Sequence, residues 1–178
     1  MARSDFSKFV EREAAEAASE PINLEAEKSF WLNKLNELYS SIRSYLSEFV
    51  DRGQVEIAEG NAVISEELLG AYQVPIMTIK IGRQTIQLKP IGTFLIGTRG
   101  RVDLTGAKGT VRLILADKDS TAPKLTVTRV DPNKPAQSKA PPRQVDWTWK
   151  IVASQAPIRY FPLEQDNFTD ALLEVANA

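Results

Sequence analysis

The residues best suited to chemistry in this chain are aspartates near the ends of predicted strands. Asp103, Asp117 and Asp119 fall on or beside neighbouring predicted strands, with Lys89 and Lys118 close in sequence. Metal-dependent nucleases use such carboxylates, with a lysine, to hold a divalent cation and an activated water. The usual spacing, an acid and a lysine two residues apart on one strand after an earlier aspartate, is not met. We therefore interpret these aspartates as structural, and keep a divalent-metal-dependent nuclease or phosphohydrolase as the alternative function.

Two glycine tetrads, residues 97–100 and 106–109, match the short pattern of the loop that clamps a nucleic-acid backbone in KH domains. That loop joins two helices, whereas both tetrads lie between predicted strands. Neither tetrad is followed at the required distance by the Gly-Lys-Ser or Gly-Lys-Thr triplet of a phosphate-binding P-loop. Turn glycines with positive φ explain both tetrads, so we predict no phosphate loop.

Trp147 and Trp149 flank Thr148, so on a strand both indoles point to the same face. Aromatic side chains on a sheet can stack on the bases of single-stranded nucleic acid, and Arg143 and Lys150 are nearby. Large aromatic residues at alternate strand positions are more often buried under a helix. We expect both tryptophans to belong to the core.

The composition excludes several kinds of active site. The 178 residues include no cysteine and no histidine, which removes thiolate chemistry, disulfides and the commonest general base and transition-metal ligand. Hydrophobic residues make up 43% and charged residues 25%, as in ordinary globular domains. We expect a protein that is not an enzyme and has no cofactor.

The charges are segregated along the chain. Residues 76–150 hold fourteen Lys and Arg against five Asp, a net of +9, while the rest holds eight basic and eighteen acidic residues, a net of −10. Seven basic residues fall in predicted turns or at strand positions that can face solvent: Lys80, Arg83, Lys89, Arg99, Arg101, Lys108 and Arg112. An acidic protein partner is the first interpretation of this basic face. Neutralisation by the chain's own acidic helices comes second, and nucleic acid third, because the pI of about 5.7 is low for a nucleic-acid binder.

Helical periodicity dominates the first fifty residues. Ser4 or Asp5 can cap a first helix that Pro21 ends, and a second helix is predicted over 24–51, with Gly53 as its stop signal. The second helix has a broad apolar stripe with spacings of three and four residues: Trp31, Leu35, Leu38, Ile42, Tyr45 and Phe49. A stripe of this width predicts packing into the protein's own core. The alternative is a homodimer formed through the Trp31–Phe49 stripe.

After Gly53 the period becomes alternating. Short strands are predicted at 55–57 and 62–64 around a turn at Gly60, followed by a single helical turn from Ser65 to Leu69. Further strands are predicted at 75–81, 85–89 (ended by Pro90), 93–96, 101–104, 110–116, 125–130 and 145–152. Asp166 or Asn167 can cap a short terminal helix.

These elements predict an α+β protein in which N-terminal helices and a short C-terminal helix pack on one face of a mainly antiparallel meander. We expect one domain, 1–178, with a helical part (1–52), antiparallel strands (53–130), a mobile Pro/Lys-rich loop (131–144) and a final strand and helix (145–178). The N-terminus does not resemble a secretory signal, and no apolar run could span a membrane, so we expect a cytoplasmic protein without a membrane partner. The function predicted is non-catalytic binding of a macromolecule by the basic face.

Overall fold

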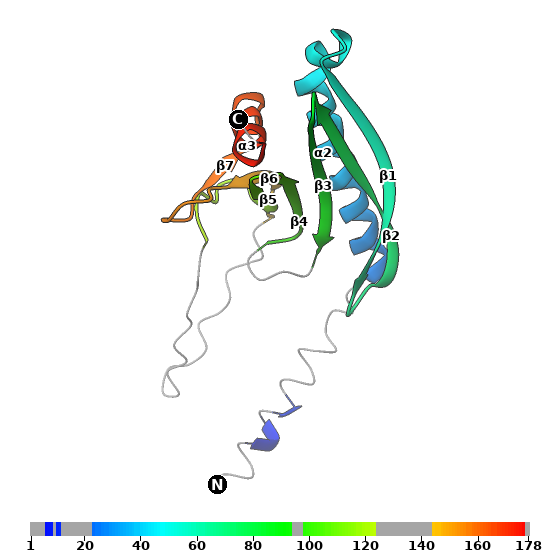
Figure 1. Ribbon diagram of the computed structural model, residues 1–178. Helices are drawn as coiled ribbons and strands as arrows, with labels where there is room; N and C mark the ends of the chain where they lie inside the picture. The colour runs from blue at the N-terminus through cyan, green and yellow to red at the C-terminus, as the bar shows by residue number, and fades with distance from the viewer. Residues whose placement is uncertain (1–5, 9, 12–22, 94–97, 124–143, 177–178) are drawn as a thin grey trace.

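The computed structural model describes residues 6–8, 10–11, 23–93, 98–123 and 144–176. Its elements, in chain order after a few helical residues among 6–11, are α2 (Leu24–Asp51), β1 (Val55–Glu66), β2 (Gly70–Ile81), β3 (Gln84–Gly92), β4 (Arg101–Gly106), β5 (Gly109–Asp117), β6 (Trp147–Val152), β7 (Tyr160–Pro162) and α3 (Gln165–Val175). The strands form one antiparallel sheet in sequential order, and α2 and α3 pack against the same face of it (Figure 1). The predicted α+β meander is confirmed.

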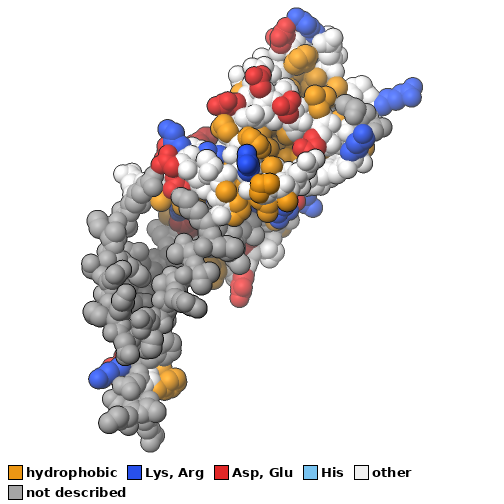
Figure 2. All heavy atoms as spheres, turned by 90° about the vertical axis from the view of Figure 1, so that its left-hand side faces the viewer, with side chains coloured by type: hydrophobic (Ala, Val, Ile, Leu, Met, Phe, Trp, Pro, Cys, Tyr) orange, Lys and Arg blue, Asp and Glu red, His pale blue; other side chains and the backbone are white. Residues whose placement is uncertain are grey.

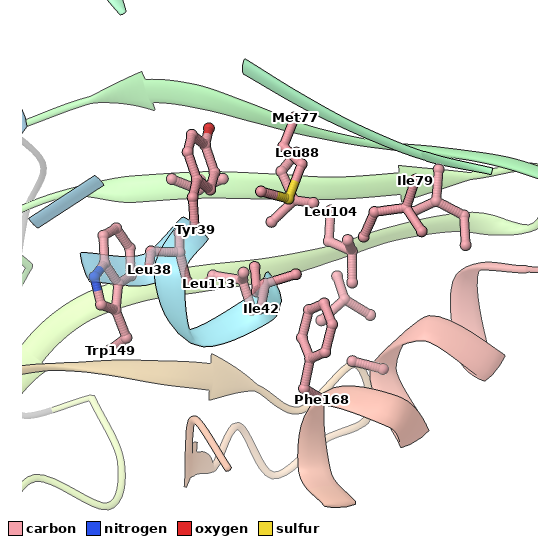
Figure 3. Close-up of a cluster of buried hydrophobic side chains, with 14 of the residues drawn as sticks. Leu38, Tyr39, Ile42, Met77, Ile79, Leu88, Leu104, Leu113, Trp149 and Phe168 are labelled. Carbon is pink, nitrogen blue, oxygen red and sulfur yellow. The ribbon is translucent and has the colours of Figure 1, made fainter. Parts of the chain in front are cut away.

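Helix α2 begins and ends where the sequence predicts. The side chain of Asn23 accepts a hydrogen bond from the main-chain N–H of Ala26, and Gly53 follows the helix with φ of 68°. Its buried face consists of Trp31, Leu35, Leu38, Tyr39, Ile42 and Leu46. These side chains meet Leu88, Leu104 and Leu113 from the sheet and Phe168 from α3 (Figure 3). Most of the apolar stripe is therefore used inside the chain's own core.

The turn predicted at Gly60 is wrong, because β1 runs without interruption from Val55 to Glu66. What changes near Gly60 is the parity of the buried positions: Val55 and Ile57 face the core before it, and Ala62 and Ile64 after it. This end of the β1–β2 hairpin has no third strand, since β2 pairs with β3 only over Met77–Ile81. A two-stranded ribbon twists more than a wider sheet, and we attribute the change in which β1 positions face the core to this twist.

Strand β3 continues through Pro90, which was predicted to end it. Pro90 pairs with Val102 of β4, and at that level β3 has no pairing with β2. A proline lacks the N–H that a second neighbouring strand would need, so it is tolerated where one side of the strand is free. Pro75 lies in the two-stranded part of β2 for the same reason.

Glu66 bridges the gap where β2 and β3 separate. Its carboxylate accepts hydrogen bonds from the main-chain N–H and the hydroxyl of Thr93 at 2.8 and 3.0 Å, and from the Tyr72 hydroxyl. Burial, followed by the hydrogen bond and negative charge of Glu66, raises the pKa of Tyr72 above its usual range. The single helical turn predicted over 65–69 is wrong, because β1 extends to Glu66 and a short turn leads into β2.

The cap predicted for α3 is also wrong. The helix begins at Gln165 with Glu164 at the N-cap, and no side chain caps it. Asn167 instead donates from Nδ2 to the carbonyl oxygen of Pro162 at 2.9 Å. The predicted cap at residues 4–5, most of the strands at 93–96 and 125–130, and loop residues 131–143 lie outside the described residues. In the part of the chain that is described, no helix is long and apolar enough to cross a membrane.

Candidate functional site

The face of β2–β5 opposite the two helices carries the basic residues of interest. We call it the outer face, and its members alternate with buried residues: Thr78, Lys80, Thr85, Gln87, Lys89, Arg101, Asp103, Thr105, Thr110 and Arg112. Successive residues of a strand point to opposite faces, so burial of Ile86, Leu88 and Leu104 under the helices directs their neighbours outward. Among the described elements, no helix packs on this face.

A row of three charges crosses the outer face. Lys89 of β3 and Arg112 of β5 both lie directly opposite Asp103 of β4 in the sheet register. Their Cα atoms are therefore separated by two strand spacings, about 10 Å. Arg101 holds Asp103 from the same strand through Nε to Oδ1 at 2.6 Å and a second bond to Oδ2 at 2.9 Å. Within the described residues, Lys89 and Arg112 form no ion pair.

Tyr160 lies beside this row. It pairs with Val152 at the start of β7, and the positive charge of Arg112 acts on its phenol. Burial raises the pKa of Tyr160, and Arg112 opposes that rise.

The other predicted basic residues separate from this row. Lys80 is on the outer face but lies 3.9 Å from Glu56 of β1. Arg83 is exposed in the β2–β3 turn, and Lys108 is in the β4–β5 turn. The main-chain N–H of Lys108 donates to the Val175 carbonyl at the C-terminal end of α3, at 2.9 Å.

Arg99 does not belong to the outer face. Its guanidinium pairs with Glu27 of α2 and lies 4.1 Å from the ring centroid of Phe30, with the Trp147 ring further away at 5.7 Å. These partners include two residues of the helix that covers the inner face. Arg99 therefore ties α2 to the sheet, and the basic face is narrower than the sequence predicts.

The three aspartates do not come together. Asp103 lies opposite Arg112, and Asp117 is five residues further along β5, about 17 Å away at the rise of a β-strand. Asp119 follows Asp117, whose Oδ1 accepts its main-chain N–H at 3.1 Å. In the described ranges, no group of three or more acidic residues could hold a metal ion. The geometry thus does not assemble the metal site of the alternative function.

The glycine tetrads have packing roles beyond their turns. A Cβ on Gly100 would meet the Trp31 ring, 2.8 Å from Cε3, and a Cβ on Gly106 would lie 2.8 Å from the Val175 carbonyl carbon. Among the described glycines of the two tetrads, only Gly109, with φ of 155°, has the positive φ expected of a turn glycine. The glycines at 100 and 106 instead let a helix side chain and a helix end approach the sheet.

Both tryptophans of β6 lie on the helix side. The Trp149 ring is 6.0 Å from that of Trp31, and its Nε1 donates to the Lys34 carbonyl at 2.9 Å. Trp147 packs against the same core. Figure 3 shows Trp149 pointing toward Leu38 of α2. Neither indole is therefore a stacking platform on the outer face.

A second surface is apolar. Ile158, Phe161 and Leu173 are exposed large hydrophobic residues of the β6–β7 loop, β7 and α3. Figure 2, which views the side where β7 and α3 lie, shows hydrophobic side chains gathered among acidic and basic ones. Of the helix stripe considered for a homodimer, Phe49 is exposed, whereas Trp31 and Leu35 are fully buried. Self-association through that stripe stays a prediction.

Two features of this region were missed from the sequence. The Arg101–Asp103 pair could have been found from its spacing, since residues two apart on a strand share a face. Lys150 is buried although it is charged, and its position between Trp149 and Ile151 in a buried strand could have indicated this burial.

No family model matches the chain, and neither a curated protein nor a solved structure matches it.

Proposed function

We propose that this protein is a non-catalytic interaction protein whose outer face binds an acidic segment of a partner protein. The observation that carries the proposal is the pair Lys89 and Arg112, two cations without an ion-pair partner among the described residues, placed about 10 Å apart on a face that no described helix covers. Surface cations of this kind attract and orient an acidic partner during encounter.

A protein partner is favoured over nucleic acid by the composition of the face. Asp103 lies at its centre and Glu56 neutralises Lys80 at one side, so positive and negative groups are interspersed. A phosphate backbone carries a charge at every nucleotide and would be repelled by these carboxylates, whereas a flexible acidic peptide can direct its carboxylates to Lys89 and Arg112 and place its uncharged main chain opposite Asp103. The tryptophans that could have stacked on bases point to the core.

The test is binding of a fluorescent, blocked oligoglutamate peptide over a series of salt concentrations. Reversal of both cations, in the double variant Lys89→Glu/Arg112→Glu, should weaken binding by about tenfold or more, because two attractive contacts become repulsive. The matched control is Arg83→Glu/Lys108→Glu, which makes the same charge change in the exposed turns beside this face. It should leave the affinity within about threefold.

Three results would overturn the proposal. The first is failure of the peptide to bind at low salt, and the second is equal weakening of peptide binding by the two double variants. The third is that duplex DNA binds more tightly than the peptide and that Lys89→Glu/Arg112→Glu weakens DNA binding as much as peptide binding. The last result would assign the face to nucleic acid. Circular dichroism of each variant checks that the fold is retained.

A further inference from the structure

Lys150 is a buried cation whose charge has no counter-ion in the described structure. Its side chain lies on the face of β6 opposite the two helices, next to the buried Ile114 of β5, and only 7% of the residue is exposed. Its Nζ donates to the carbonyl oxygen of Lys118 at 2.8 Å. An ammonium group has three donors and a full charge, so a single backbone acceptor leaves two donors and the charge uncompensated.

A groove of about 480 Å³ opens beside Lys150. It follows β6 where β7 leaves the sheet, because β7 pairs only with Lys150–Val152. Residues of α2, β6 and the segments beside them line the groove, and among them are three lysines (Lys34, Lys118, Lys150) and three acidic residues (Glu37, Asp146, Glu164). Lys34 pairs with Glu37 at 2.7 Å and Lys118 with Asp146 at 3.8 Å, whereas Lys150, the most buried of the three, has no acidic partner among the described residues.

The edge of β6 adds a main-chain donor to this groove. The Trp149 carbonyl faces β7, where it accepts the N–H of Leu163 at 3.2 Å. Alternate residues of a strand direct their main-chain groups to the same side, so the N–H of Trp147 faces that side too, beyond the last residue of β7. No backbone partner for it exists in the ranges that the structure describes.

We infer that this groove receives a carboxylate from the acidic partner segment, held by the Lys150 ammonium. The inference rests on the proposed function, because it names where one acidic side chain of that partner binds. The groove is also within reach of the outer face: Lys150 pairs with Ile114, and Ile114 pairs with Arg101, so two strand spacings separate Lys150 from Arg101. A carboxylate supplies the charge and the acceptors that Lys150 lacks.

The substitution Lys150→Met separates binding from stability. It removes the ammonium but keeps a flexible apolar side chain of similar length. Without any peptide, we expect its free energy of unfolding in urea to be equal to or higher than that of the wild type, because an uncompensated buried charge is lost. Its affinity for the blocked oligoglutamate should fall by about tenfold or more, as expected for a charge-assisted hydrogen bond. The matched control Lys118→Met changes an exposed, ion-paired lysine of the same groove and should alter the affinity by less than about threefold.

Adding different anions to the protein distinguishes a carboxylate of a peptide from a free small anion in this groove. The NMR signals of the Lys150 ¹³Cε and of the Trp147 main-chain ¹⁵N are followed on addition of oligoglutamate, acetate or inorganic phosphate. We expect oligoglutamate to shift both signals in wild-type protein at concentrations where acetate and phosphate do not. An equal response to a small anion would assign the groove to a free small molecule and overturn the inference.

Unchanged oligoglutamate affinity in Lys150→Met would overturn the inference and leave the proposed function standing, provided that Lys89→Glu/Arg112→Glu still weakens binding. A loss of stability in Lys150→Met without peptide would also count against it, since the hydrogen bond to the Lys118 carbonyl would then stabilise the fold by more than the buried charge destabilises it. If oligoglutamate binds neither the wild type nor any variant, both the inference and the proposed function fail.

Discussion

At the scale of single residues, Gly100 and Gly60 differ in how closely other atoms pack against them and not in the sign of φ. Gly100 lies where the edge of the Trp31 ring meets the sheet, whereas Gly60 lies in an exposed strand, where a Cβ would have only the Ile76 side chain near it, at 3.6 Å. Neither glycine has a positive φ. Their sequence contexts look equally turn-like, so the two positions differ only in what lies next to them in three dimensions.

Gly100→Ala should therefore destabilise the protein and Gly60→Ala should not. The new methyl group at residue 100 would overlap the Trp31 ring, which is fully buried and cannot move aside, and overpacking of this kind costs about 1–3 kcal/mol. At residue 60 the methyl group makes an ordinary contact, and the less flexible unfolded chain offsets any loss. Urea unfolding of both variants measures the difference. Equal stability of the two would mean that Trp31 does not pack against Gly100.

At the scale of elements, the N-terminus of α3 lacks the cap that α2 has. Asn23 bonds to the Ala26 amide in α2, while Glu164 at the same position of α3 makes no side-chain cap. The backbone of Glu164 is extended, which is the conformation that a capping residue needs.

Glu164→Asp should stabilise the protein by about 0.5–1 kcal/mol, because the shorter carboxylate can accept the free amides of the first turn without a change in net charge. Asn23→Ala, which removes the existing cap, should cost about 1 kcal/mol and serves as the reference for the size of a cap in this fold. Thermal and urea unfolding give both values. A destabilised Glu164→Asp would show that the glutamate has a contact worth more than a cap.

The elements themselves were largely predictable, and the two errors within strands have a common cause. The broad stripe of α2 predicted its buried face and Gly53 predicted its C-terminal end, because helical periodicity and stop signals are local properties of the sequence. The errors at Gly60 and Pro90 arise where a strand has a neighbour on one side only, so that residues typical of turns are tolerated within it. Sequence patterns do not report how many neighbours a strand has.

At the scale of the whole molecule, the candidate site was only partly predictable. The charge segregation correctly indicated Lys89 and Arg112 as surface cations, but Arg99 lies among helix residues on the inner side. Whether a cation has an ion-pair partner depends on its neighbours across strands. Lys89 lies opposite Asp103, 14 positions away in the chain, but Asp103 pairs with Arg101 instead. The uncompensated Lys150 could not be recognised until β6, β7 and the segment after β5 were placed together.

The half of the β1–β2 hairpin next to its turn is a two-stranded ribbon, without a third strand among the described residues. Over residues 70–76, β2 has only β1 as a neighbour, and Glu66 joins this ribbon to Thr93, just after the end of β3. Gly92 permits that contact, since a Cβ there would lie 2.9 Å from the Glu66 carboxylate. A charged acceptor with three donors contributes more than an exposed ion pair does.

Glu66→Ala should consequently speed amide hydrogen exchange across residues 62–74 by about tenfold, while β4 and β5 keep their protection, because the ribbon can open without disturbing the rest of the sheet. The matched control is Glu59→Ala on the same strand, which removes an exposed pair with Arg43 and should change exchange by less than about threefold. Exchange followed by mass spectrometry resolves these segments. If Glu66→Ala raised exchange uniformly over all seven strands, the ribbon would be part of one cooperative unit with the sheet, and Glu66 would stabilise the whole fold rather than hold one hairpin in place.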